Sequence, residues 1–300
     1  MSDPSSALAA PSTRESRKPK PAPQPSFAER WLAPRNLIVA LITTILVVGQ
    51  WQYSILGGYE VLAICLGTAV ATELALSLFL RGHVPNVQSA YVSGISATLL
   101  TKTAAGVWWP LFAVPALSIA SKYVLAYKGR HLWNPTNFGV CCMVLVAPSS
   151  VTVLSHEFGN SLGTNLTIWS MGFVIAWRAK VIHLTFTYLA AFSALSWVRA
   201  AILGTAFATE SAPITGPMYQ LFLFFMITDP RTVVSKRKWQ VVTVLAISVV
   251  EMLFRLANDF ELPGSAYVSN PPAMYALAVV GPIAMFIDLA TKKPAPAKAV

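Results

Sequence analysis

The chain has 300 residues, of which 55% are hydrophobic and only 11% are charged, and its formal net charge is +10. Charged residues make up about a quarter of a typical soluble domain, so this composition excludes an ordinary water-soluble protein. Membrane proteins collect Lys and Arg in cytoplasmic loops, which accounts for the positive charge without a nucleic acid partner. The three cysteines, Cys65, Cys141 and Cys142, lie in apolar runs and predict neither a disulfide framework nor a metal site.

The N-terminal region is rich in Ser, Pro, Ala and Lys and lacks the apolar core of a signal peptide. We therefore expect residues 1–35 to form a disordered, basic cytoplasmic tail. Residues 292–300 predict a second, short cytoplasmic tail. The chain between the two tails is membrane-embedded in this interpretation.

Ten apolar segments follow one another along the chain. A spanning helix needs about 20 apolar residues, and three segments are shorter: 88–101, 164–177 and 216–228. These three either cross fully or enter as half-crossings with irregular backbone. The other seven segments are 37–56, 59–80, 104–125, 136–154, 181–204, 239–256 and 272–290.

The distribution of charge supports this number of segments. If the N-terminus is cytoplasmic and every segment crosses, most of the 22 Lys and Arg residues fall on the cytoplasmic side. The opposite side then receives Glu157, Glu210, Asp259 and Glu261. Leaving out one segment breaks the alternation from that point onward. The charge pattern therefore predicts ten crossings with both termini in the cytoplasm.

The two halves of the chain repeat one pattern. Each half has a Ser/Thr-Gly pair at a short segment and, further on, an Asn-Pro pair. Each half also contains five segments, and two units with an odd number of crossings must have opposite orientations. The sequence thus predicts an all-α, polytopic membrane protein with two inverted five-helix repeats, 36–155 and 156–291. The paired motifs are Ser93-Gly94 with Thr215-Gly216, and Asn134-Pro135 with Asn270-Pro271.

The Ser/Thr-Gly pairs are candidates for the openings of broken helices. Glycine lets the backbone turn, and a helix N-terminus presents free N–H groups to an anion such as a phosphate. In the alternative interpretation, each pair begins an ordinary short helix. In an inverted-repeat protein, ligand sites are expected near the membrane midplane, where such broken helices meet.

Two longer strings carry a resemblance to a known family. They are the nine residues from His131 to Gly139, HLWNPTNFG, and the seven from Phe224 to Pro230, FFMITDP. Together they resemble the RnfD/NqrB family, the membrane flavin proteins of the Rnf electron transport complex and of the sodium-pumping NADH:quinone oxidoreductase, over roughly residues 80–290. The compact chain also resembles the integral membrane members of this family that are encoded beside enediyne antibiotic pathways.

The resemblance implies a flavin-binding membrane subunit of a bacterial plasma membrane. It implies FMN or riboflavin as cofactor, electron transfer coupled to cation movement, and partner membrane or redox subunits. In the two complexes, FMN is attached to a Thr in a Ser-Gly-Ala-Thr-like motif. The nearest string here, Ser161-Leu162-Gly163-Thr164, lacks that order. We therefore expect any flavin to be non-covalent, with Thr164 as the candidate attachment site otherwise.

Polar residues of these motifs form the candidate cofactor site. Asn134 and Asn270 are also expected to cap helices that begin with proline. Asp229 has an alternative role as a surface partner of Arg231 and the basic run that follows. The full set of candidate cofactor-binding residues is Ser93, Gly94, Asn134, Asn137, Thr215, Gly216, Thr228, Asp229 and Asn270.

Glu73 lies deep in the apolar segment 59–80, where a bare carboxylate is costly. It is expected to serve as an ion or proton relay or, equally, as an internal hydrogen-bonded strut. Glu251 and Arg255 are four residues apart on one helix face and are expected to pair. No phosphate-binding loop, nucleophile elbow or zinc-protease motif is present, which disfavours ATP-driven and hydrolytic chemistry.

Two further functions remain as alternatives to a flavin subunit. A transporter or channel of the same inverted-repeat fold would move a small solute or a pathway product without a cofactor. An assembly scaffold in a biosynthetic pathway is the third interpretation. The missing attachment motif favours the transporter, whereas the Asn-Pro and Thr-Asp-Pro strings favour the flavin subunit.

Overall fold

The computed structural model describes residues 34–56, 58–153 and 162–292. The predicted tails lie outside these residues except at their inner ends, because the first described helix already begins at Pro34. Glu157 and Ser161 also lie outside the described residues. Within them the chain is mostly helical, as the composition predicts.

Five of the described helices are long and apolar enough to cross a membrane. They are α2 (Pro34–Tyr53), α3 (Tyr59–Arg81), α8 (Ile182–Leu203), α11 (Arg237–Asp259) and α12 (Pro272–Thr291). Shorter helices pack among them: α4 (Gln88–Leu100), α5 (Trp109–Val124), α6 (Pro135–Val146), α7 (Leu162–Arg178), α9 (Phe207–Ser211) and α10 (Pro217–Leu221). Two 3₁₀ turns span Ala212–Thr215 and Ser265–Tyr267.

Two short strand pairs correct the expectation of purely helical segments. β1 (Thr101–Thr103) pairs antiparallel with β4 (Val151–Val153). The predicted segment 136–154 is therefore helical only as far as Val146. Pro148 cannot continue a helix, and the β-branched Val-Thr-Val run that follows suits a strand. A second pair, β2 (Ala126–Tyr127) with β3 (Arg130–His131), forms a hairpin.

Two other predicted segments also have irregular backbone. Residues 104–108 precede α5, with Gly106 at a φ of +76°. The segment 216–228 is not one α-helix, because α10 passes at Phe222 into a π-helical turn, η2 (Phe222–Met226). Single π turns inside helices are frequent at functional sites.

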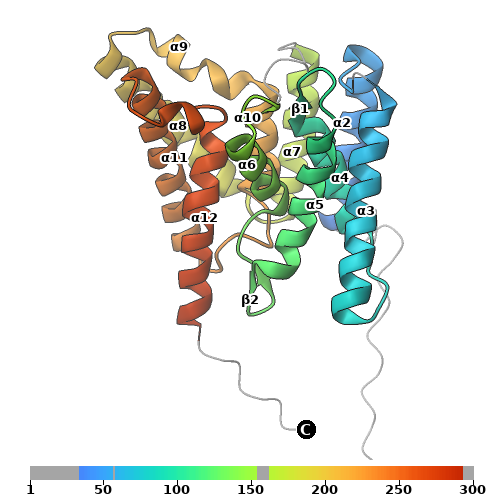
Figure 1. The fold of residues 1–300 in the computed structure, drawn as a ribbon. Helices are drawn as coiled ribbons and strands as arrows, with labels where there is room; N and C mark the ends of the chain where they lie inside the picture. The colour runs from blue at the N-terminus through green and yellow to red at the C-terminus, as the bar shows by residue number, and fades with distance from the viewer. Residues whose placement is uncertain (1–33, 57, 154–161, 293–300) are drawn as a thin grey trace, which may run out of the picture.

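The molecule has two ends, and basic residues of a hairpin lie at one of them. At one end, the hairpin end, β2–β3 lies beside the end of α12 (Figure 1), and Lys128 Nζ donates to the carbonyl oxygen of Leu289 at 2.7 Å. Arg130 of the same hairpin donates to the carbonyl oxygens of Pro230, Arg231 and Val233. The opposite end, the α9 end, carries α9 and β1 (Figure 1).

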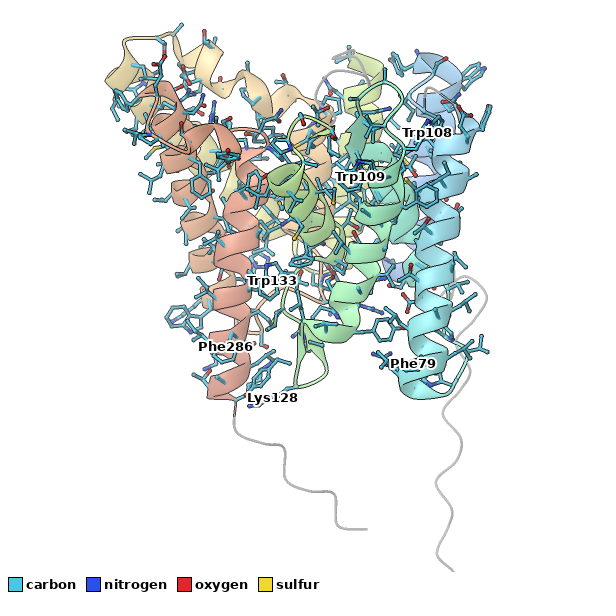
Figure 2. All side chains as sticks on the ribbon, viewed as in Figure 1. Phe79, Trp108, Trp109, Lys128, Trp133 and Phe286 are labelled. Atoms are coloured by element: carbon cyan, nitrogen blue, oxygen red, sulfur yellow. The ribbon has the colours of Figure 1, made fainter. Side chains whose placement is uncertain are left out.

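Large apolar side chains cover the outside of the helices. Phe79 on α3 is 88% exposed (Figure 2). Phe286 on α12 is 50% exposed, and its ring lies beside Tyr127 of the β2–β3 hairpin, with ring centroids 5.3 Å apart. Trp108 and Trp109 lie toward the α9 end and are about half exposed (Figure 2). Exposing such a large apolar surface to water is unfavourable, whereas contact with lipid hydrocarbon is not. The apolar helices are thus consistent with contact to a lipid bilayer.

Glycine allows close helix packing at Gly94. A Cβ atom at this position would lie 2.9 Å from the Cα atom of Leu66 on α3. Gly94 is therefore a contact residue within α4, six residues after the helix begins at Gln88. The expectation that Ser93-Gly94 opens a helix is wrong, because the helix starts one and a half turns earlier.

Candidate ligand-binding cavity

A cavity of about 410 Å³ lies between the two halves of the described chain. This volume falls in the range of small-molecule sites. α2, α4, the end of α5, the start of α6, the end of α7 and the η2 turn form its walls. Its apolar lining includes Ile38, Ile42, Val92, Leu99, Leu100, Ile175, Leu221, Phe224 and Phe225, and its polar lining includes Gln88, Ser89, Ser93, Ser96, Lys122, His131, Asn134, Thr136, Thr228, Asp229 and Arg231.

Asn134 joins the two strings that carry the resemblance. It is the N-cap of α6, and its Oδ1 atom accepts a hydrogen bond from the backbone N–H of Asn137 at 3.1 Å. Its Nδ2 atom donates to Oδ2 of Asp229 at 3.2 Å. One side chain thus caps a helix and connects the Asn-Pro string to the Thr-Asp-Pro string, 95 residues later, at the cavity wall.

Thr228 and Asp229 end the segment that contains the π turn. The Thr228 hydroxyl donates to the carbonyl oxygen of Phe224 at 2.5 Å. Asp229 accepts from the backbone N–H of Arg231 at 3.0 Å, and burial raises its pKa above the ordinary value. In the described part of the chain, Asp229 forms no ion pair with Arg231, so the expected surface pair is replaced by contacts to Asn134 and to backbone.

Glu73 has a partner that sequence reasoning did not identify. Lys122 Nζ lies 3.3 Å from Glu73 Oε2, and both side chains are less than 10% exposed. The hydroxyl of Tyr123 donates to Glu73 Oε1 at 2.9 Å, and Lys122 also donates to Ser89 Oγ at 2.9 Å. Because Lys122 and Ser89 line the cavity, this network connects Glu73 to it. The sequence signal that could have identified this partner is a lysine, Lys122, inside the apolar segment 104–125.

His131 is a second cavity residue that sequence reasoning missed. Its Nδ1 atom is buried and has no hydrogen-bond partner among the described residues. Burial, together with the positive charges of Arg231, Lys122 and Arg81, lowers the pKa of His131 to about 4. A neutral imidazole with an unused ring nitrogen therefore faces the cavity at neutral pH. The available sequence signal was its place as the first residue of the string HLWNPTNFG.

Four of the predicted cofactor-binding residues line the cavity: Ser93, Asn134, Thr228 and Asp229. Asn137 is buried next to it and donates to the carbonyl oxygen of Met274 at 3.0 Å. Gly94 faces α3 instead, and Thr215 with Gly216 precede α10, at the other end of that segment from Thr228. Thr164 lies in the first turn of α7, and its side chain is outside the described part.

Asn270 does not match Asn134. α12 begins at Pro272 with Pro271 at the N-cap position and no side-chain cap, and Asn270 is exposed in the preceding loop. The expected cap at Asn270 is therefore wrong. The reason is local, because a second proline, Pro272, follows Pro271 and moves the helix start one residue along the chain.

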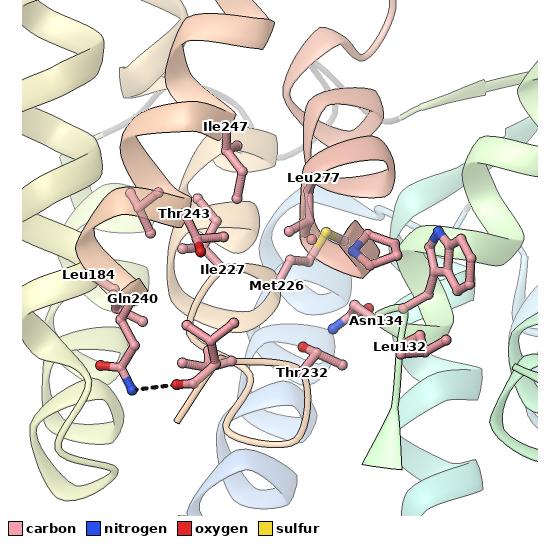
Figure 3. Close-up of a pocket in the computed structure, with 16 residues that line it drawn as sticks. Leu132, Asn134, Leu184, Met226, Ile227, Thr232, Gln240, Thr243, Ile247 and Leu277 are labelled. Carbon is pink, nitrogen blue, oxygen red and sulfur yellow. Dashed lines mark hydrogen bonds between the residues drawn. The ribbon is translucent and has the colours of Figure 1, made fainter. Parts of the chain in front are cut away.

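A smaller cavity of about 30 Å³ lies next to the main one. Figure 3 shows Met226, the last residue of the η2 turn, beside Leu277 of α12, and Asn134 near them. Asn134 and Met226 line both cavities, so they form part of the wall between them. At the far side of the small cavity, Gln240 Nε2 donates to the carbonyl oxygen of Val234 at 2.9 Å (Figure 3).

The cavity has the general properties of a small-molecule site. It combines apolar and aromatic walls with a polar group of Lys122, His131, Arg231 and Asn134, and His131 Nδ1 offers an unused hydrogen-bonding atom. Ligand sites commonly pair such walls with a few polar groups.

The chain matches no protein-family model, and no curated protein matches it significantly.

Proposed function

We propose that this chain is a membrane subunit that binds a flavin, FMN or riboflavin, non-covalently in the 410 Å³ cavity. The supporting observation is the hydrogen bond from Asn134 to Asp229, which brings the two flavin-subunit-like strings together at the cavity wall. When bound, a flavin supplies one- and two-electron transfer. We also propose that the chain has partner redox subunits, with which the flavin would exchange electrons.

The residues of the chain would hold the cofactor by charge and shape. Lys122 and Arg231 provide positive charge for a phosphate or a reduced ring, and neutral His131 provides a hydrogen bond. Phe224 and Phe225 provide apolar contact surface. Glu73 would keep Lys122 in place through their ion pair, which favours its strut role at this site. Thr164 is not part of the proposed site.

We further propose that the chain crosses the membrane ten times as two inverted repeats, with both termini in the cytoplasm. Equivalent neighbours support this: α3 packs on α5 as α8 packs on α11, and α5 packs on α6 as α11 packs on α12. The basic residues gathered at the hairpin end support the orientation. Reporter fusions at the two termini and at the Lys128-Gly129 turn should all report the cytoplasm, and a mixed result would contradict ten crossings.

The flavin proposal is tested by the absorbance spectrum of the protein purified in mild detergent. A flavin band that is near-stoichiometric with protein and is lost on acid precipitation supports a non-covalent flavin. A band that survives precipitation contradicts the non-covalent part and makes Thr164→Ala the next variant. A colourless protein that binds neither added FMN nor added riboflavin overturns the proposal.

A cofactor-free transporter is the second candidate. It is favoured by the position of the cavity, which lies between the short helix α4 and the interrupted segment α10–η2. Transporter sites are typically built from such discontinuous segments. A colourless protein that moves a small solute across vesicle membranes would support this alternative.

A further inference from the structure

A second buried carboxylate lies in the other half of the molecule, away from the cavity. Glu251 of α11 is 1% exposed. The hydroxyl of Tyr188 on α8 donates to its Oε2 atom at 2.5 Å, and the hydroxyl of Tyr219 on α10 donates to its Oε1 atom at 2.7 Å. Both tyrosines are themselves buried. Each carboxylate oxygen thus has one hydrogen-bond donor from a neighbouring helix.

No cation neutralises Glu251 by direct contact in the described part of the chain. Arg255, its expected partner one turn along α11, turns away: its Nη2 atom donates to the carbonyl oxygen of Glu210 at 2.8 Å and lies 3.7 Å from Glu210 Oε2. The expected Glu251–Arg255 pair is therefore absent. A charged carboxylate so placed in a membrane helix is costly, and a proton is the simplest species that removes the cost.

A path of polar groups leads from Glu251 to the α9 end. A cavity of about 10 Å³, close to the smallest space that holds one water molecule, is lined by Glu251, Ser248, Arg255, Arg199 and Ser196. Beyond it, Arg199 contacts Glu210 and forms two hydrogen bonds of 2.7 Å with Asp259. Glu251 lies eight residues before the end of α11, or roughly 12 Å along the helix.

We propose that Glu251, held by Tyr188 and Tyr219, is an internal proton-binding site that exchanges protons with the solution at the α9 end. A hydronium ion from that solution transfers its proton to the Glu251 carboxylate, which leaves a water molecule and a neutral carboxylic acid. The new O–H then donates to one tyrosine oxygen, and that hydroxyl turns its own proton away. The proposal does not depend on what the larger cavity binds.

The titratable and charged groups around Glu251 and along the path from it to the α9 end belong to four elements. They are Tyr188 and Arg199 of α8, Glu210 of α9, Tyr219 of α10, and Arg255 and Asp259 of α11. The two arginines and two carboxylates balance one another in charge. Within this set, Glu251 is the carboxylate that contacts hydroxyls in place of guanidinium groups, which makes it the protonation site.

Infrared spectroscopy of the full chain in lipid vesicles tests this site as the pH is lowered. The wild-type protein should develop the C=O stretch of one buried, protonated carboxylic acid, and Glu251→Gln should lose that band and take up one proton fewer. Tyr219→Phe keeps the volume and should move the band to higher frequency, because the acid loses a hydrogen bond. Glu60→Gln, on the exposed first turn of α3, should retain the band.

The route of exchange is tested by the rate of proton uptake after a pH jump. Ser248→Val fills the small cavity and should slow uptake several-fold, whereas Thr185→Val, a buried substitution on α8 outside that cavity, should leave the rate unchanged. A band that persists in Glu251→Gln, or is insensitive to Tyr219→Phe, overturns the site. Equal rates in the two valine variants overturn the proposed route.

Discussion

Asn134 illustrates how one side chain serves two parts of the structure. Its Oδ1 atom caps α6, and its Nδ2 atom contacts Asp229. The sequence predicts the cap because Asn before Pro is a common helix start. It does not predict the contact with Asp229, because nothing local links residues 95 positions apart in the chain.

The matched Asn-Pro pairs provide a test of the cap. Asn134→Ala should lower the free energy of unfolding by about 1 kcal/mol or more, because it removes a helix cap and a contact between the two strings. Asn270→Ala should change it by less than about 0.5 kcal/mol, because that side chain is exposed and does not cap α12. Denaturant unfolding in detergent measures both, and equal effects would contradict the asymmetry.

Replacing one partner of the Glu73–Lys122 ion pair should destabilise the fold more than replacing both partners. Glu73→Gln leaves a buried ammonium without its counter-ion, which should destabilise the protein by about 3–5 kcal/mol. The double variant Glu73→Gln, Lys122→Met should recover much of this loss, because no charge stays buried.

Thermal unfolding in detergent follows this series, with Glu60→Gln on the exposed first turn of α3 as the control. A single variant as stable as the wild type would show that the ion pair is unimportant for the fold.

His131 should make stability depend on pH in the mildly acidic range. Its pKa is about 4 in the folded protein against an ordinary 6.5, so the unfolded chain binds the extra proton between these values. Above pH 6.5 His131 is neutral in both states and does not lower the free energy of unfolding. As the pH falls from 6.5 toward 4, the unfolded chain binds the proton first, so the free energy of unfolding decreases.

The comparison of wild type with His131→Gln isolates this contribution. Unfolding curves collected between pH 7 and pH 4 should show the wild type losing more stability than the variant as the pH falls. Parallel curves for the two proteins would contradict a neutral, buried His131.

At the scale of elements, the η2 turn shapes the cavity wall. Phe224 of this turn packs edge-on against Trp169 and Phe173 of α7, with ring centroids 5.3 Å apart in both contacts. Gly172 lies between those two residues in the helix sequence, and a Cβ atom there would approach the Phe224 ring to 2.4 Å. The absence of a side chain at Gly172 thus lets the π turn sit against α7.

Gly172→Ala should therefore displace Phe224 and lower stability by about 1–3 kcal/mol, the usual cost of overpacking. Gly163→Ala on the same helix meets nothing within 4 Å and should be neutral or slightly stabilising. Denaturant unfolding of the two variants measures the difference. Equal stability would indicate that Phe224 moves without cost.

The elements also show where pattern reading succeeds and fails. Long apolar runs such as 59–80 and 272–290 correspond closely to α3 and α12, because length and hydropathy suffice for a spanning helix. The end of 136–154 and the segment 216–228 differ, because a proline and a π turn are local events that hydropathy does not detect. Ser93-Gly94 was misread because glycine also serves close helix packing.

At the scale of the whole molecule, four of the nine candidate cofactor-binding residues come together. Asn134, Thr228, Asp229 and Ser93 line one cavity. His131 and Arg231 lie at the edges of the two strings, whereas Lys122 reaches the same cavity only through tertiary packing, which no local pattern encodes. The sequence therefore indicated four of the lining residues, and the structure added Lys122, His131 and Arg231.

The central claim, that this cavity binds a flavin, is tested most directly by blocking it. Ser96→Trp places a large ring in the cavity, whereas Leu145→Trp places the same ring on the exposed side of α6. Saturable quenching of FMN or riboflavin fluorescence should be seen with wild type and Leu145→Trp, and affinity should fall about tenfold or more in Ser96→Trp. Equal affinity in all three proteins, or no binding to any of them, would contradict the account.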